Sequence, residues 1–162
     1  MTRQILACLL LMTACADRDR DVTTAQLGNV EYAVPDGWDM HDASQNASTI
    51  LVWTPATNPR KQSVTIIRTQ PMPAMARADE SRLAATLGET MHQPAKPFRT
   101  KQGIAGVRVD GRFTPPGTQA TYARSHMVFA DGDTLVHVIY TSADPDREVF
   151  DLVIDHLARK AG

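Results

Sequence analysis

The sequence predicts an α+β domain in which an antiparallel β-sheet of about six or seven strands packs with two main helices. Three observations lead to this fold class. Short apolar or alternating segments are separated by turns rich in Pro, Gly and Asp. Two other segments repeat apolar residues at helical spacing. The order along the chain is strands, helix, strands, helix.

The first half of the chain predicts strands followed by one helix. Residues 30–34 alternate as a strand does, and the Pro35-Asp36-Gly37 turn leads into Trp38. Residues 49–53 and 62–69 give two further strands, separated by a loop from Pro55 to Pro59. From residue 77 to about 92 apolar residues recur at four-residue spacing, which predicts an amphipathic helix. Its apolar residues are Leu83, Leu87 and Met91, with Ala84 beside them.

The second half predicts a long meander. After residues 98–102, the run from Gly106 to Phe113 alternates, so that Val107, Val109 and Phe113 share one face of a strand. Arg108, Asp110 and Arg112 share the other face. Residues 115–117 turn the chain and residues 121–130 return it. Residues 135–140 are apolar at both parities, which places that strand in the middle of the sheet.

A second helix closes the domain. Asp144 and Pro145 are typical of an N-cap and a first helical position. Arg159 and Lys160 would stabilise the C-terminal end through the helix dipole. Its apolar stripe consists of Val149, Phe150, Val153, Ile154 and Leu157.

The N-terminus has the form of an export signal. Arg3 precedes an apolar run of about ten residues that is too short to span a membrane. Leu11-Met12-Thr13-Ala14-Cys15 resembles a bacterial lipobox, which implies a lipid on Cys15. Ala16 after the cysteine implies sorting to the outer membrane of a Gram-negative bacterium, facing the periplasm. We therefore expect a signal peptide at 1–14, a lipidated cysteine and tether at 15–27, and one domain at 28–162.

The charge, the cysteines and the missing motifs argue against several classes of function. The formal net charge is −1, and nothing in this charge balance suggests nucleic-acid binding, which would call for a basic face. Because Cys8 leaves with the signal and Cys15 carries lipid, no thiol remains for a disulfide, a zinc site or a nucleophile. The chain contains no nucleophile elbow, phosphate-binding loop or zinc-protease motif. We expect no enzyme activity and no cofactor.

Two histidines, His126 and His137, are weak candidates for metal ligands. If Asp131-Gly132 is a two-residue hairpin turn, Ala130 faces Asp133 and His126 faces His137, with Cβ atoms about 5 Å apart. No third ligand can be named, so no metal is predicted. Met72, Met75, Met91 and His92 offer soft copper ligands, but methionine is also common core filler.

A family resemblance follows from the opening Tyr32-Ala-Val34-Pro35-Asp-Gly37-Trp38. It resembles the Tyr-x-x-Pro-x-Gly-Trp start of domains of the PsbP/Mog1/DcrB type. The midchain helix, the strand from Gly106 to Phe113 and the closing helix with Phe150 are similar too. The resemblance implies an antiparallel sheet covered by helices, used mainly as a non-catalytic binding or assembly module.

The expected function is therefore that of a membrane-anchored envelope lipoprotein that binds another protein as an accessory module. An immunity lipoprotein that inhibits a toxin, a small-ligand-binding protein and a hydrolase are the alternatives. A hydrolase would need titratable groups such as Tyr122, Arg124 and His126 to converge. The candidate partner-binding surfaces are the loops 55–59 and 115–117, an exposed Trp53, and the charged residues Arg108, Asp110 and Arg112. The strand position of Trp53 is also typical of a core residue, and the charged residues also fit an ordinary strand face that is solvated or covered by a helix.

Overall fold

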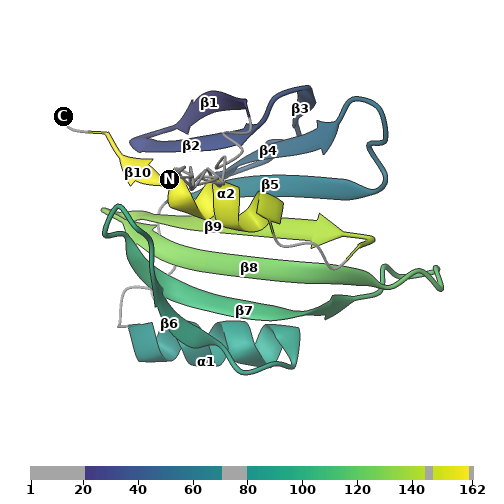
Figure 1. Cartoon of the computed structure of the whole chain (residues 1–162). Helices are drawn as coiled ribbons and strands as arrows, with labels where there is room; N and C mark the ends of the chain where they lie inside the picture. Colours follow the sequence, from purple (N-terminus) through teal and green to yellow (C-terminus); the bar gives the residue numbers. More distant parts are fainter. Residues whose placement is uncertain (1–20, 71–79, 145–147, 161–162) are drawn as a thin grey trace, which may run out of the picture.

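Two antiparallel sheets and two helices form the domain in the computed structural model, which describes residues 21–70, 80–144 and 148–160 (Figure 1). The larger sheet has seven strands in the order β3-β4-β5-β9-β8-β7-β6, and the smaller has three in the order β1-β2-β10. The strands of the larger sheet are β3 (Trp38–Asp42), β4 (Ser48–Pro55), β5 (Gln62–Thr69), β6 (Lys96–Arg99), β7 (Ala105–Phe113), β8 (Tyr122–Asp131) and β9 (Thr134–Ser142). The smaller sheet contains β1 (Val22–Leu27), β2 (Val30–Pro35) and β10 (Ala158–Arg159).

The architecture confirms the expected α+β class. The two helices are α1 (Glu80–Met91) and α2 (Glu148–Asp155), and β9 is the central strand of the larger sheet. The smaller sheet was not expected. It arises because β2 pairs with β1 on one side and with the two-residue β10 on the other. β1 begins at Val22, so the folded domain extends into the segment expected to be tether.

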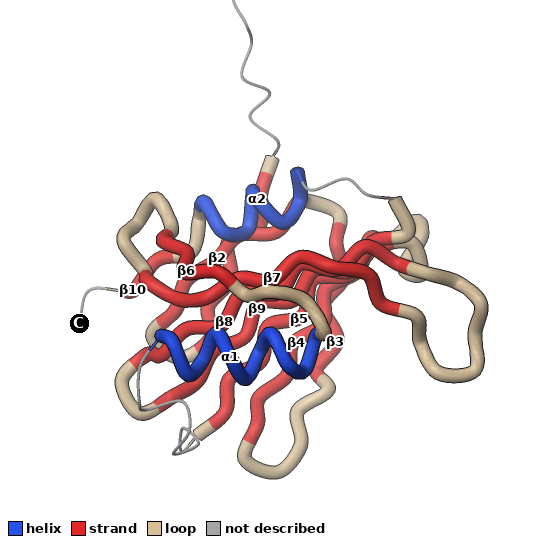
Figure 2. The backbone as a smooth tube through the Cα atoms, turned by 90° about the horizontal axis from the view of Figure 1, so that it is seen from below, coloured by secondary structure: helices blue, strands red, loops and turns tan. Residues whose placement is uncertain are grey.

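The two helices lie on opposite faces of the larger sheet, with the strands between them (Figure 2). The main core lies on the α2 face of the larger sheet. Every second residue of the central strands points to this face. There α2 and β2 pack on buried side chains of β5, β8 and β9. These include Ile66, Met127, Phe129, Val138 and Tyr140. The stripe expected on the closing helix is buried in this core: Val149, Phe150, Val153, Ile154 and Leu157.

The α1 face has a smaller core. Leu87 of α1 packs with buried Val107 and Val109 of β7, and with Val128 and Leu135 of the β8–β9 hairpin. Leu83, Ala84 and Met91 add the rest of the amphipathic face that the sequence predicts. The central hairpin is therefore buried from both sides.

The C-terminal residues do not continue the helix as expected. α2 ends at Asp155, and Arg159 belongs to β10, where its Nε lies 3.0 Å from Asp131 Oδ1 and its Nη2 donates to the Ala130 carbonyl at 2.8 Å. This contact fastens the smaller sheet to the β8–β9 hairpin. Of the expected helix start, Pro145 lies outside the described residues, and the helix is described from Glu148.

Within the described chain, neither helix is long and apolar enough to cross a membrane. Cys15 and the expected signal at 1–14 lie outside the described residues.

Gly106 of β7 sits where a side chain has no room. A Cβ built there would lie 2.4 Å from the Val128 carbonyl oxygen and 2.9 Å from Phe129 Cβ. Gly106→Ala must therefore push β7 from β8, and we expect a loss of about 2–3 kcal/mol in the free energy of unfolding, at the upper end of overpacking effects. Urea denaturation followed by circular dichroism measures it.

Gly111→Ala is the matched control, since it lies in the same strand. Its Cβ would meet only the Gln93 side chain, at 3.2 Å, which is free to shift. An equal loss of stability in both variants would contradict the steric account.

Candidate functional site

Polar side chains gather at two places on the β7–β8–β9 part of the larger sheet, one on each face. On the α1 face lie Arg124, His126 and His137; on the α2 face lie Arg108 and Asp110. This separation follows from the alternation of side chains along a strand.

The two histidines meet, but not in the expected register. Asp131 pairs with Thr134, so the turn residues are Gly132 and Asp133 instead of Asp131 and Gly132. His126 therefore lies opposite Ile139, and His137 lies opposite Val128. Gly132 has a φ of +60°, as the first turn residue of a type II′ hairpin requires.

The register differs by two residues, which leaves both histidines on the same face as diagonal neighbours. His126 Nε2 lies 3.0 Å from His137 Nδ1, and the ring centroids are 5.2 Å apart. One ring donates its N–H and the other accepts it.

Burial keeps the pair neutral. It lowers the pKa of His126 to about 3, with the charges of His137 and Arg124 adding to the effect. Burial also lowers the pKa of His137 to about 4. A neutral pair can share one hydrogen bond, whereas two imidazolium rings would repel each other.

The histidine pair has no third metal ligand beside it in the described part of the chain. No three His, Cys, Asp or Glu residues form a cluster there. Of the soft ligands considered from the sequence, Met72 and Met75 lie outside the described residues. Met91 packs in the α1 core, and His92 is exposed just after α1.

Arg124 is the residue whose setting the sequence did not reveal. Parity placed it correctly beside Tyr122 and His126, but its guanidinium also lies over the Phe113 ring, with Cζ 4.3 Å from the centroid. Its Nε is buried and has no hydrogen-bond partner in the part of the chain that the structure describes. Burial lowers the pKa of Arg124. Among the described residues it makes no ion pair.

On the α2 face Arg108 is enclosed by aromatic rings. Its Cζ lies 4.7 Å from the centroid of Phe150 and 5.5 Å from that of Phe98. Its Nε and Nη2 donate to Asp110 at 3.1–3.2 Å, and Asp110 also accepts from Ser125 Oγ at 2.6 Å. The Arg108 side chain is only 15 % exposed, so the ion pair belongs to the packing under α2 and is not the exposed charge expected.

Of the two other residues expected on the surface, Arg112 and Trp53, the first is exposed and the second is buried. Trp53 is 8 % exposed, and its Nε1 donates to the buried Tyr32 hydroxyl at 3.1 Å. This bond ties β4 of the larger sheet to β2 of the smaller one. The expectation of an exposed Trp53 anchor is therefore wrong, because the ring is part of the core.

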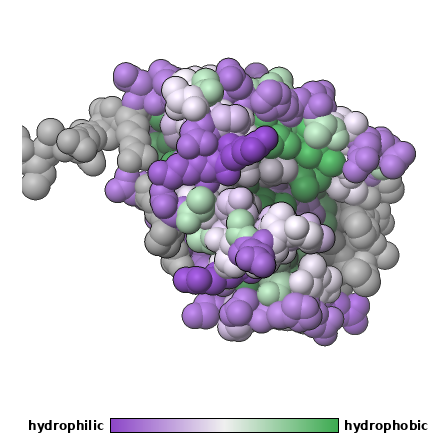
Figure 3. All heavy atoms as spheres, turned by 90° about the vertical axis from the view of Figure 1, so that its right-hand side faces the viewer, coloured by the Kyte–Doolittle hydropathy of each residue, from purple (hydrophilic) through white to green (hydrophobic). Residues whose placement is uncertain are grey.

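Both loops singled out in the sequence lie at one end of the larger sheet, since Gln62 and Ala123 each pair with Ser142. The 56–61 loop is braced by Lys61, whose Nζ lies 2.6 Å from Asp144 Oδ2 and whose carbonyl accepts from Ala143 N at 2.8 Å. The 114–121 loop is closed by the Thr114 and Thr121 hydroxyls, 3.0 Å apart. Figure 3 looks onto this end and shows apolar surface between hydrophilic side chains.

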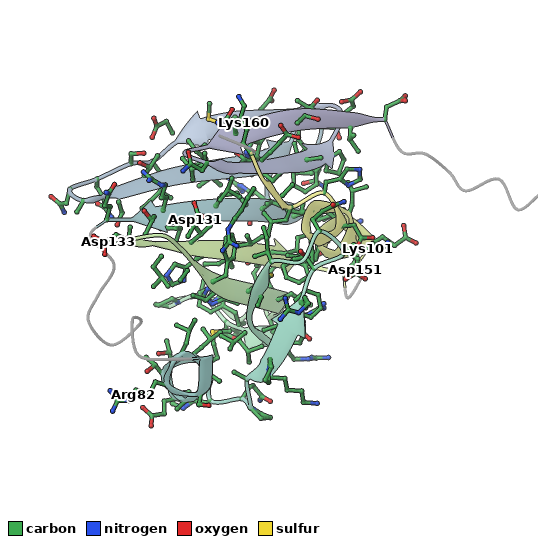
Figure 4. The ribbon with its side chains drawn as sticks, turned by 90° about the vertical axis from the view of Figure 1, so that its left-hand side faces the viewer. Arg82, Lys101, Asp131, Asp133, Asp151 and Lys160 are labelled. Atoms are coloured by element: carbon green, nitrogen blue, oxygen red, sulfur yellow. The ribbon has the colours of Figure 1, made fainter. Side chains whose placement is uncertain are left out.

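The opposite end of the sheet is charged. Figure 4 shows Asp131 and Asp133 at the tip of the β8–β9 hairpin and places Lys101 and Asp151 on the side of α2. Lys101 pairs with Asp155 and Asp131 pairs with Arg159, so these charges brace the fold.

Comparison with known proteins shows the fold alone. No family model matches the chain, and no curated protein matches it in sequence. It is similar to the solution structure of cyanobacterial PsbP (CyanoP) from Synechocystis sp. PCC 6803, with a TM-score of 0.55 and 14 % identity over 92 % of this chain and 98 % of that one. A crystal structure from Bacteroides thetaiotaomicron VPI-5482 gives a TM-score of 0.55 at 13 % identity over 82 % of this chain, which spans 46 % of that chain. The fold is thus PsbP-like.

The histidine pair predicts acid sensitivity. An unfolded histidine titrates near pH 6.5, whereas the folded pair takes up protons only near pH 3–4. Between these values the unfolded state binds more protons, so stability falls as the pH drops below about 6.5. At about 1.4 kcal/mol per pKa unit, we expect the loss to reach a few kcal/mol by about pH 4. Urea titrations at a series of pH values measure it.

The double variant His126→Leu, His137→Leu should lose much less stability between pH 6.5 and pH 4, so that its free energy of unfolding changes little with pH in this range. His41→Leu, at an exposed strand position, is the control and should leave the slope unchanged. A double variant with the same slope as the parent would show that other groups cause the acid sensitivity.

Proposed function

We propose that this protein is a partner-binding accessory module of the bacterial cell envelope that performs no reaction. The observation that carries the proposal is the placement of the 56–61 and 114–121 loops, which are exposed, internally braced and at the same end of a stiff sheet. Binding residues concentrate on loops that a rigid scaffold positions. Loops already held in shape lose less entropy when a partner binds.

The polar clusters support a binding role over a catalytic one. Arg108, Asp110 and Ser125 satisfy one another under α2, and His126 bonds to His137. Catalysis needs a nucleophile or a base that faces an open site and has a pKa suited to the reaction. The paired groups instead serve packing, so the loop end is the surface left for function.

The proposed location in the cell envelope is inferred from the N-terminal sequence. The apolar run that ends at Cys15 resembles a lipobox, and Ala16 after it implies the outer membrane of a Gram-negative bacterium. Acyl chains on Cys15 would hold the domain at the periplasmic surface, since each buried CH₂ contributes about 0.8 kcal/mol. β1 begins at Val22, so a short segment separates the anchor from the domain. An envelope assembly subunit and a toxin inhibitor would both use this arrangement.

Crosslinked capture of the protein from its own cells tests the proposal. We expect one stoichiometric partner, which Cys15→Ala reduces because the domain is no longer held at the membrane. Arg60→Glu, in the 56–61 loop, should also reduce capture by reversing a charge at the interface. An envelope subunit or a toxin among the captured proteins would separate the two roles.

Arg99→Glu is the matched control. Arg99 is an exposed arginine of β6 at the opposite end of the sheet, so this change should leave capture intact. Equal losses for both charge reversals would contradict the loop-end assignment, and recovery of the protein alone would contradict the binding role.

A further inference from the structure

We propose that Arg124 anchors a binding site for a small organic carboxylate on the α1 face of the sheet, between Phe113 and His126. This site is separate from the partner-binding loops, although Phe113 and Tyr122 flank the base of the 114–121 loop. It rests on the geometry around one half-buried cation.

Among the residues that the structure describes, the Arg124 charge has no counter-ion. Arginine keeps its charge and offers five N–H donors. Opposite it stand Gly111 on β7 and Thr141 on β9, and its same-face neighbours on β8 are Tyr122 and His126. None of these residues is a carboxylate, and the buried Nε lacks an acceptor. A half-buried charge in this state costs free energy that an anion would recover.

The shape of the site also fits a planar anion. The Arg124 guanidinium lies over the Phe113 ring at 4.3 Å, which occupies one flat side and leaves the N–H groups at its edge for a planar acceptor. Directly opposite, Gly111 has no side chain, and Gln93 Cγ lies 3.2 Å from where its Cβ would be. A carboxylate can receive two parallel N–H···O bonds from such a guanidinium.

The charge and the apolar surroundings of the site select the class of anion. The site has one cation, because His126 and His137 form a neutral hydrogen-bonded pair. A monoanion matches this charge better than a phosphate dianion does. Phe113 and Ile139, which lies opposite His126, provide apolar surface for the body of an organic acid. A carboxylate with an apolar body, such as benzoate, therefore fits both the charge and the surroundings.

Isothermal titration calorimetry of the full-length chain in detergent with sodium benzoate tests the site. Sodium phosphate and sodium chloride at matched ionic strength are the comparison anions. We expect saturable benzoate binding and weak or no binding of the other two. Arg124→Met should weaken benzoate binding about 10-fold or more, and Arg124→Lys should also weaken it because an ammonium lacks the bidentate fork.

Arg112→Met is the matched control, since Arg112 is an exposed arginine that points to the other face of the neighbouring strand. It should bind benzoate as the parent does. The Arg124 Nε–H resonance of the parent chain gives a second readout that needs no variant, and it should shift with benzoate in step with the calorimetry. His126 ring resonances should shift as well, because Arg124 acts on that ring electrostatically.

Three results would overturn the inference. The first is the absence of saturable benzoate binding together with an unmoved Arg124 resonance. The second is equal binding by the Arg124→Met and Arg112→Met chains. The third is phosphate binding more tightly than benzoate, which would show that the ligand class is wrong. Loss of partner capture from cells affects none of these readouts, so the two proposals fail separately.

Discussion

Burial of the β8–β9 hairpin from both sides is the constraint on which the rest of this structure depends. Met127, Phe129 and Val138 face the core under α2, while Val128 and Leu135 face α1. β9 is the central strand of seven, and β8 is next to it. Apolar burial on two faces supplies most of the stabilisation of such a layered domain. Close approach of β7 to β8 at Gly106 is part of the same packing.

This burial decides what the polar residues of the hairpin can do. A polar group removed from water must find a partner, or its desolvation costs about 1–3 kcal/mol. Ser125 finds Asp110, and His126 finds His137. Arg124 is different, because the ring of Phe113 covers it without accepting a conventional hydrogen bond. The paired groups are satisfied within the fold, whereas Arg124 is the cation at which we propose that an anion binds.

Periodicity was sufficient to predict β2, β4, β5, β7, β8 and β9, both helices and the central place of β9, because those elements follow from which residues must be buried. Details that depend on tertiary contacts were not predictable. β10 has only two residues, which pair with β2 and are held near the β8–β9 hairpin by the contact of Arg159 with Asp131. The histidine register was two residues off because Gly132 takes the first turn position. Arg108 looked exposed because Phe98 and Phe150, which enclose it, come from distant parts of the chain. The strand position of Trp53 allowed both a core residue and an exposed anchor, and only the contact with Tyr32 of β2 decides for the core.

The claim that the two buried histidines of the central hairpin satisfy each other within the fold is tested most directly by nitrogen-15 NMR of the histidine rings at about pH 5, below the pH 6.5 at which an unperturbed histidine titrates. The account predicts that His126 and His137 both give the spectrum of a neutral ring, with one protonated nitrogen each and a proton shared between Nε2 of His126 and Nδ1 of His137. A doubly protonated ring at either position would contradict it, because a charged imidazole there would mean that the hairpin face is open to water and available for acid–base chemistry.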